Sequence, residues 1–155
     1  MTPCDDVTIS TAGCEEGKCR IRLPGGAEVG PVWGQVLENA FTLPDGRLLL
    51  ILTDDCPFEE GIRIFLFRPD GQIDDMIQGG VIYTPGLYFL KSVRPDGIDF
   101  TFFSDRVVHH LTIDPPRWRW RLGLPTGWTY GGPQLRRYLF LTESEVAGDE
   151  NDNQG

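Results

Sequence analysis

The sequence contains no long hydrophobic run. Its longest aliphatic stretch, residues 48–52, is only five residues long, whereas a membrane-spanning helix needs about 20. The first 30 residues hold several acidic side chains and lack the apolar centre of a secretory signal. We therefore expect a protein without membrane segments that stays in the cytoplasm.

Positive charge is also scarce. The chain has 14 Lys and Arg residues against 23 Asp and Glu residues, a formal net charge of −9. Such an excess repels phosphate backbones, so it argues against nucleic acid as the main ligand, while it allows a basic protein partner. Residues 143–155 hold five of the acids and no base. This composition predicts a disordered acidic tail that follows a single domain at residues 1–142.

The common signatures of enzymes are missing. No Walker loop, Gly-x-Gly-x-x-Gly or His-Glu-x-x-His pattern occurs, and Ser104, beside Asp105, lacks the Gly-x-Ser-x-Gly context of a nucleophile elbow. His109 and His110 would point to opposite faces of a strand, one buried and one exposed, so they cannot act as a pair. Either could still act alone in acid–base chemistry. We expect no catalytic activity and no cofactor.

The four cysteines form no diagnostic pattern. Three of them, Cys4, Cys14 and Cys19, precede residue 20, and the fourth is Cys56. Their spacing lacks the paired Cys-x2-Cys knuckles of a zinc site, so we expect no metal site. A disulfide could hold an N-terminal arm in an oxidising compartment, whereas in a reducing cytosol all four would be free thiols. The sequence leaves these two alternatives open.

Turn-forming and aromatic residues, in contrast, are abundant. The 19 Gly and 12 Pro residues make up about a fifth of the chain and indicate dense turns, and aromatic residues at 11% provide surface for an ordered core. The tripeptide Pro-Asp-Gly occurs at residues 44–46, 69–71 and 95–97. Pro presets φ, Asp bonds to nearby backbone and Gly accepts a positive φ. Each tripeptide therefore predicts a β-hairpin.

The segments on either side of these turns have the composition of strands. Residues 62–68 are mostly apolar on both faces at a period of two, which predicts a central strand. Short strands joined by tight turns, without amphipathic helices between them, predict an all-β fold: an antiparallel meander of about nine or ten strands that forms a sandwich or barrel. A short helix at residues 32–41 is the competing prediction there, because its apolar residues also fit helical spacing after Pro31.

The acidic segment at residues 53–61 is the most distinctive loop of the chain. It places Asp54, Asp55, Glu59 and Glu60 within seven residues, around Phe58. Clustered carboxylates suit a hard cation, but their spacing does not match a calcium loop with alternating ligands. A second interpretation is a solvated connector whose charges protect the neighbouring apolar strands from aggregation. The third is a partner-binding loop in which acidic residues surround an apolar anchor.

A second charged pattern lies near the C-terminal third of the chain. Arg117, Arg119 and Arg121 alternate with Trp118 and Trp120. On a strand this alternation places the arginines on one face and the tryptophans on the other, whereas binding of single-stranded nucleic acid would need both on the same face. We therefore expect the tryptophans in the core, and the three arginines form a secondary candidate surface for an anion or a partner.

Several of these features together resemble a known group of proteins. The acidic segment, residues 62–67, the Pro-Asp-Gly hairpins and the sequence Tyr83-Thr84-Pro85-Gly86 are similar to small β-rich bacterial immunity proteins, which are made beside secreted antibacterial toxins such as those of type VI secretion. The resemblance extends over residues 35–125. It implies stoichiometric binding of one cognate toxin and no catalysis, and the Arg-rich, Lys-poor composition fits a bacterial source.

The expected function is accordingly a non-catalytic inhibitor of a basic toxin. The residues that we expect at or near the contact are Asp54, Asp55, Phe58, Glu59 and Glu60. Two other classes remain open. One is a structural or assembly module of a larger bacterial complex, which would pair with neighbours through exposed strand edges. The other is a small hydrolase or metal-binding protein.

Overall fold

The computed structural model describes residues 1–56, 59–80, 86–118 and 123–146, with the backbone alone at 115–118. Within this part of the chain thirteen strands form three antiparallel sheets, and there is no helix. Consequently no helix that could cross a membrane occurs there. The predicted all-β fold is confirmed in its sandwich form, because none of the sheets closes into a barrel.

The three sheets contain six, four and three strands. The six-stranded sheet has the order β1 (Thr2–Pro3), β5 (Val36–Thr42), β6 (Leu48–Thr53), β7 (Gly61–Phe67), β8 (Ile73–Gly80) and β12 (Trp128–Tyr130). The four-stranded sheet has the order β13 (Arg136–Glu145), β11 (Val107–Trp118), β10 (Gly97–Thr101) and β9 (Phe89–Arg94). The three-stranded sheet has the order β2 (Thr8–Ser10), β3 (Lys18–Arg22) and β4 (Glu28–Trp33).

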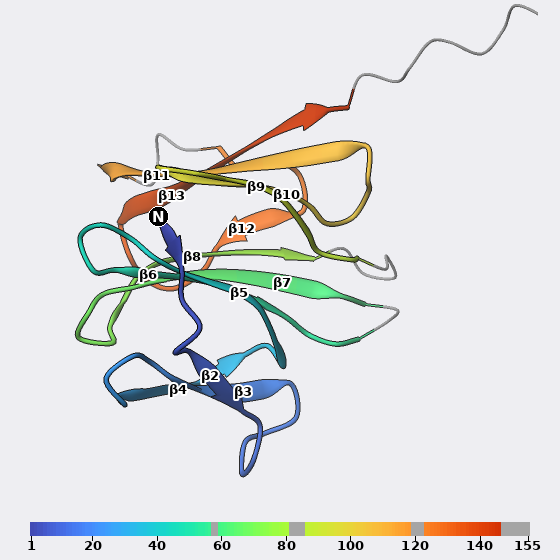
Figure 1. The fold of residues 1–155 in the computed structure, drawn as a ribbon. Coiled ribbons are helices and arrows are strands. Elements are labelled where there is room, and N and C mark those ends of the chain that lie inside the picture. Colours follow the sequence, from blue (N-terminus) through green and yellow to red (C-terminus); the bar gives the residue numbers. More distant parts are fainter. Residues whose placement is uncertain (57–58, 81–85, 119–122, 147–155) are drawn as a thin grey trace, which may run out of the picture.

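The six-stranded sheet lies between the other two, so the molecule has three layers and two cores (Figure 1). Alternate residues of β6 serve the two cores: Leu49 belongs to the core shared with the four-stranded sheet and Leu50 to the core shared with the three-stranded sheet. Ile64 and Phe65 of β7 divide in the same way. Since β7 also pairs with both β6 and β8, the prediction of a central strand at residues 62–68 is confirmed.

All three Pro-Asp-Gly tripeptides form hairpin turns, as predicted. In the first, the backbone N–H of Gly46 donates to the carbonyl oxygen of Leu43 at 3.0 Å. The N–H of Leu43 in turn donates to the carbonyl oxygen of Arg47 at 2.8 Å. Gly46 has a φ of 86°, which explains why glycine ends the tripeptide. The second repeats this pattern, and the third joins β9 directly to β10. Residues 24–26, Pro-Gly-Gly, make a similar turn that the sequence analysis missed.

Two predictions for the first 41 residues differ from the structure. The prediction of a helix at residues 32–41 is wrong, because Gly34, with a φ of 127°, turns the chain between the strands β4 and β5. The apolar residues with helical spacing therefore lie on two strands with different neighbours. The N-terminal residues are also more than an arm, because β2, β3 and β4 form a complete layer over the central sheet. These short strands and β12 raise the number of strands above nine or ten.

The C-terminal boundary of the domain also shifts. Strand β13 runs to Glu145, three residues beyond the predicted end of the domain at residue 142. Glu143, Ser144 and Glu145 pair with β11 in regular register, because cross-strand hydrogen bonds do not require apolar side chains. Residues 147–155 lie outside the described part of the chain, so the prediction of disorder is untested there.

A buried ion pair connects the four-stranded and six-stranded sheets. Arg137 of β13 and Asp75 of β8 are both fully buried, with Nη1 of the guanidinium 2.7 Å from Oδ1 of the carboxylate. The second carboxylate oxygen accepts the backbone N–H groups of Tyr138 and Leu139 at 2.8 and 2.9 Å. These bonds partly compensate the desolvation of the two charges and fix the position of β13 relative to β8.

Candidate functional site

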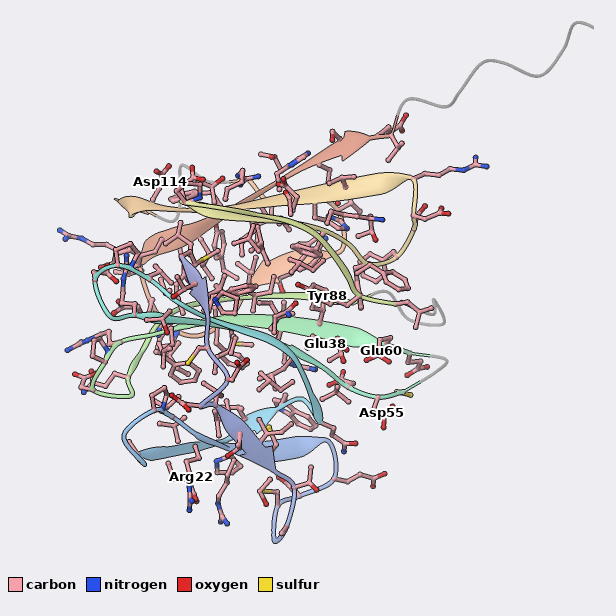
Figure 2. The ribbon with its side chains drawn as sticks, viewed as in Figure 1. Arg22, Glu38, Asp55, Glu60, Tyr88 and Asp114 are labelled. Carbon is pink, nitrogen blue, oxygen red and sulfur yellow. The ribbon has the colours of Figure 1, made fainter. Side chains whose placement is uncertain are left out.

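The acidic segment connects β6 to β7 at one end of the central sheet, where Figure 2 labels Asp55 and Glu60. Oε1 of Glu60 accepts the backbone N–H groups of Asp54 and Asp55 at 2.6 and 3.0 Å, and Oε2 accepts that of Cys56 at 3.0 Å. Burial raises the pKa of Glu60, and the three N–H donors oppose that effect. Asp55 has a φ of 55°, a conformation that Asp tolerates better than most residues. The Glu60 carboxylate therefore holds the loop in shape.

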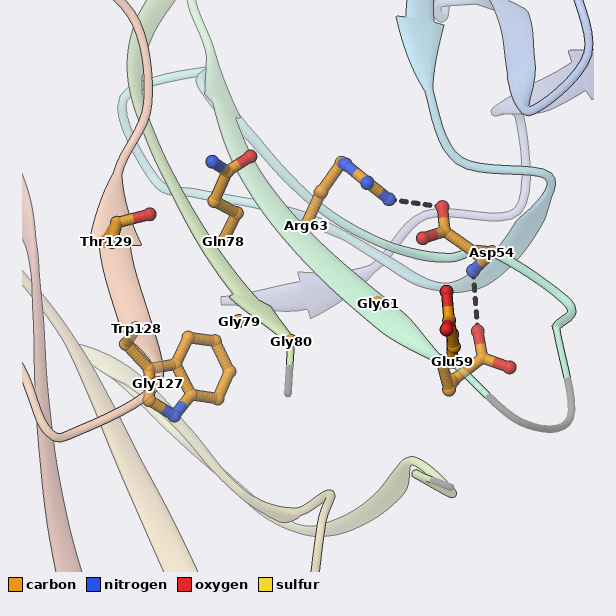
Figure 3. A pocket seen from close by; sticks show the side chains of 11 residues that line it. Asp54, Glu59, Gly61, Arg63, Gln78, Gly79, Gly80, Gly127, Trp128 and Thr129 are labelled. Atoms are coloured by element: carbon orange, nitrogen blue, oxygen red, sulfur yellow. Dashed lines mark hydrogen bonds and ion pairs between the residues drawn. The ribbon is translucent and has the colours of Figure 1, made fainter. Parts of the chain in front are cut away.

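A chain of charged and aromatic side chains extends from this loop towards the three-stranded sheet. Asp54 forms an ion pair with Arg63 of β7, which Figure 3 shows as a dashed line. Cζ of Arg63 lies 6.0 Å from the centre of the Trp33 ring, and Nζ of Lys18 lies 4.9 Å from it. Trp33 is the last residue of β4 and is 51% exposed. Contacts between these cations and the indole keep a large aromatic side chain at the surface.

A pocket of about 470 Å³ opens beside the acidic loop (Figure 3). Its walls come from the loop and β7, from the end of β8, and from β12 with the residue before it. The lining residues include Asp54, Glu59, Glu60, Arg63, Gln78 and Trp128. Gly79 shapes the wall, because a Cβ at this position would lie 2.8 Å from Cε3 of Trp128. Three acidic groups against one guanidinium give the lining a negative balance.

The structure brings most of the predicted site residues together. Asp54, Glu59 and Glu60 line the pocket, and Asp55 lies on the same loop with an exposed side chain. Within the described residues, no hydrogen bond or ion pair engages the carboxylates of Asp55 and Glu59. Phe58 lies outside the described part of the chain, so its position is untested.

The secondary surface predicted from the arginines is also untested. Arg119 and Arg121, with Trp120 between them, lie outside the described residues. For Arg117 the structure gives only the backbone, which pairs with that of Arg137 across β11 and β13. The candidate site is therefore the pocket at the acidic loop.

Sequence reasoning missed several residues of this site. Gln78 of β8 lines the pocket because it is the partner of Arg63 across β7 and β8. Trp128 and Thr129 of β12 are more than 60 residues from the loop in sequence and reach the pocket because β12 pairs with β8, with Trp128 opposite Gly79. The Gly79-Gly80 pair was a usable signal, because glycine at the end of a strand marks a position where another group approaches the backbone closely. Trp33 gave no comparable signal.

The two adjacent histidines point to opposite faces of β11, as predicted. His109 is 1% exposed, and its ring centre lies 5.1 Å from those of both Phe100 and Trp128. Its Nδ1 is 3.1 Å from Oε1 of Glu143. Burial, followed by the proximity of His110, lowers the pKa of His109 from 6.5 to about 4. His109 is therefore a neutral core residue at pH 7, whereas His110 faces outwards.

The thiols and carboxylates of the described residues form no metal centre. All four cysteines are free, and Cys19 is buried in the core below the three-stranded sheet. No group of three or more His, Cys, Asp or Glu residues in the described ranges could hold a metal ion.

Comparison of the chain with protein-family models, curated proteins and solved structures gave no match. The function must therefore be argued from the site itself.

Proposed function

We propose that this protein binds a basic protein partner at the pocket beside the acidic loop and acts by occupying that partner, as an immunity protein occupies its toxin. The observation that carries the proposal is the combination of a negatively charged pocket with an exposed tryptophan next to it. A pocket of about 470 Å³ has room for a Lys or Arg side chain of the partner. This binding requires no chemical step at the pocket.

The acidic residues divide into two groups with different roles. Asp54 and Glu60 are engaged inside the molecule, by Arg63 and by the loop backbone respectively. Asp55 and Glu59 are the exposed carboxylates of the same loop. They are therefore the groups that can pair with basic side chains of a partner, and the net charge of −9 adds long-range attraction.

Trp33 supplies the apolar contact that charges alone do not provide. Exposed charge pairs contribute under about 1 kcal/mol each, so carboxylates alone would give fast association and a short-lived complex. Tryptophan is among the residues most often responsible for binding energy at protein interfaces. Trp33 is half exposed and is held by Lys18 and Arg63 at the side of the acidic loop. Phe58, predicted from the sequence, remains a second proposed anchor.

The test is capture of the partner from cells of the source organism. Wild-type protein and two charge-reversal variants, Glu59→Lys and Asp6→Lys, are immobilised and the bound proteins are identified by mass spectrometry. Asp6 is exposed, lies between β1 and β2 and does not line the pocket, so its reversal controls for net charge. We expect one basic protein in stoichiometric amount on the wild type and on Asp6→Lys, and at least a tenfold loss on Glu59→Lys.

The captured protein then decides between the functional classes. An immunity function requires that the purified partner be toxic and that equimolar wild-type protein neutralise it. Equal capture by Glu59→Lys would remove the pocket from the interface and contradict the proposal. A non-toxic structural partner would instead favour an assembly module.

A further inference from the structure

The outer face of the four-stranded sheet carries a second array of polar residues, far from the acidic loop in sequence. Nδ1 of His110 lies 2.8 Å from Oδ1 of Asp99, and Nε2 of the same ring lies 2.7 Å from Oγ of Ser144. The three residues belong to the neighbouring strands β10, β11 and β13. One imidazole thus connects a carboxylate to a serine hydroxyl through its two nitrogens.

The strand register explains why these residues meet. Asp99 and His110 are direct partners across β10 and β11. Thr142 is the partner of His110 on β13, and Ser144 lies two residues further along the same face. Their neighbours Ile98, Phe100, His109 and Leu111 point into the core. The array therefore stands on the solvent side of a rigid sheet.

Asp99 is fixed by further donors. Oγ of Ser92 lies 2.6 Å from Oδ2 of Asp99, and the guanidinium of Arg94 binds the other carboxylate oxygen. Burial disfavours ionisation of Asp99, but the hydrogen bonds from Ser92, His110 and Arg94 outweigh that effect and lower its pKa. An ionised carboxylate at Nδ1 keeps the proton of the neutral imidazole on that nitrogen. Nε2 is then free to accept the proton of the serine hydroxyl.

We infer that Ser144 is an activated nucleophile that reacts with acyl and phosphonyl electrophiles, with His110 as its general base and Asp99 as the positioning residue. Nucleophile, base and orienting carboxylate within hydrogen-bond distance of one another are the geometric requirement for this chemistry. The substrate class that fits an exposed serine on an open sheet face is an activated carboxylic ester. This inference is independent of partner binding at the pocket.

The reaction proceeds in two balanced steps. Oγ of Ser144 bonds to the acyl carbon, its proton passes to Nε2 of His110, and the bond from the acyl carbon to the leaving oxygen breaks as that oxygen takes the proton. A water molecule, deprotonated by His110, then attacks the acyl-serine, and the proton returns to Oγ. The net reaction is ester plus water to acid plus alcohol.

The sheet also sets a limit on the rate. Backbone N–H groups of a strand lie in the plane of its sheet, so those of β11 and β13 do not point at an oxyanion that develops above the outer face. Loss of even one oxyanion donor slows serine hydrolases by about 100-fold or more. We therefore expect acylation that is readily measured as a covalent adduct, followed by slow turnover.

The experiment is covalent labelling of the full chain with a fluorophosphonate, which forms an Oγ–P bond and releases fluoride. Intact mass gives the stoichiometry, and peptide mapping gives the site. We expect one adduct per chain, at Ser144, with Ser10 and Ser104 unmodified. Both control serines bond to nearby backbone N–H groups instead of a histidine. Modification spread equally over the serines, or none at Ser144, would overturn the inference.

Variants separate activation from mere accessibility. His110→Gln removes the base and should slow labelling about 100-fold, and Asp99→Asn should slow it through the orientation of the imidazole. Ser10→Ala is the matched control, because Ser10 lies on β2 of the three-stranded sheet, and it should label at the wild-type rate. His110 and Asp99 lie on the outer face of the four-stranded sheet, and circular dichroism confirms that each variant is folded. Equal labelling rates in His110→Gln and the wild type would also overturn the inference.

Discussion

At the scale of single residues, His109 makes the stability of the folded protein depend on pH. Its ring is packed between Phe100 and Trp128 and has no aligned hydrogen bond to either nitrogen. Because burial lowers its pKa from 6.5 to about 4, the unfolded chain binds a proton more readily than the folded one between these values. The contribution of neutral His109 to stability is therefore complete above about pH 6.5 and is lost as the pH falls towards 4.

The first prediction concerns this residue. His109→Leu places an apolar side chain of similar volume in the core and removes the titrating group. From pH 7 to pH 4 the wild type should lose up to about 3 kcal/mol of unfolding free energy more than the variant does. Urea denaturation at several pH values measures the difference. Parallel pH profiles for the wild type and His109→Leu would refute the assignment.

A second residue-scale prediction concerns the buried ion pair of Asp75 and Arg137. Asp75→Ala leaves the guanidinium buried without its charged partner, and it also removes the acceptor of two backbone N–H groups of β13. We expect a loss of about 3–5 kcal/mol. Glu28→Ala, which breaks a surface pair with Arg20, should cost under about 1 kcal/mol. Chemical denaturation compares the two, and similar costs would show that the buried pair does not hold the sheets together.

At the scale of elements, strand β13 shows what composition alone misses. Residues 143–145 are polar and acidic, so the sequence assigns them to a tail, yet they continue the pairing with β11. Strand extension depends on backbone hydrogen bonds and on the length of the partner strand, and neither is visible in the composition of the segment itself. The Pro-Asp-Gly hairpins are the opposite case, because the turn chemistry of three residues determines them locally.

The third prediction follows from this extension. A chain that ends at Thr142 loses the pairs of residues 143–145 with β11, whereas a chain that ends at Val146 keeps them. Thermal and urea denaturation should show the shorter chain to be more than about 1 kcal/mol less stable than the longer one. The chain ending at Val146 should match the full-length protein within about 0.5 kcal/mol. Equal stability of both truncated chains would contradict the role given to the end of β13.

At the scale of the whole molecule, the sequence predicted the fold class better than the candidate site. Period-two patterns in residues 62–68 and the repeated hairpins were sufficient for an all-β sandwich. The third layer was missed because the polar residues before Leu23 contain few apolar side chains to mark strands. The acidic half of the pocket was predicted from residues adjacent in the chain. Trp128 and Gln78 were not, because only the pairing of β7 with β8 and of β8 with β12 brings them to the loop.

The fourth prediction tests the apolar part of the proposed interface. Once the partner is captured, Trp33→Ala should increase its dissociation rate about tenfold or more, because a tryptophan at an interface contributes mainly to the lifetime of the complex. Leu135→Ala is the matched control, since Leu135 is an exposed apolar residue at 60% outside the pocket lining. Surface plasmon resonance measures both variants. Equal dissociation rates for the wild type and Trp33→Ala would exclude Trp33 from the contact.

Asp55 and Glu59 are proposed to attract a basic partner to the pocket, and the association rate of the captured partner at two salt concentrations tests this role directly. The double variant Asp55→Asn with Glu59→Lys leaves Asp54 and Glu60 in place, and Asn tolerates the positive φ of residue 55, so the loop keeps its internal bonds. For the double variant we expect association at least tenfold slower at low salt and a weaker dependence on salt, with an unchanged circular dichroism spectrum. An unchanged association rate in the folded double variant would contradict it.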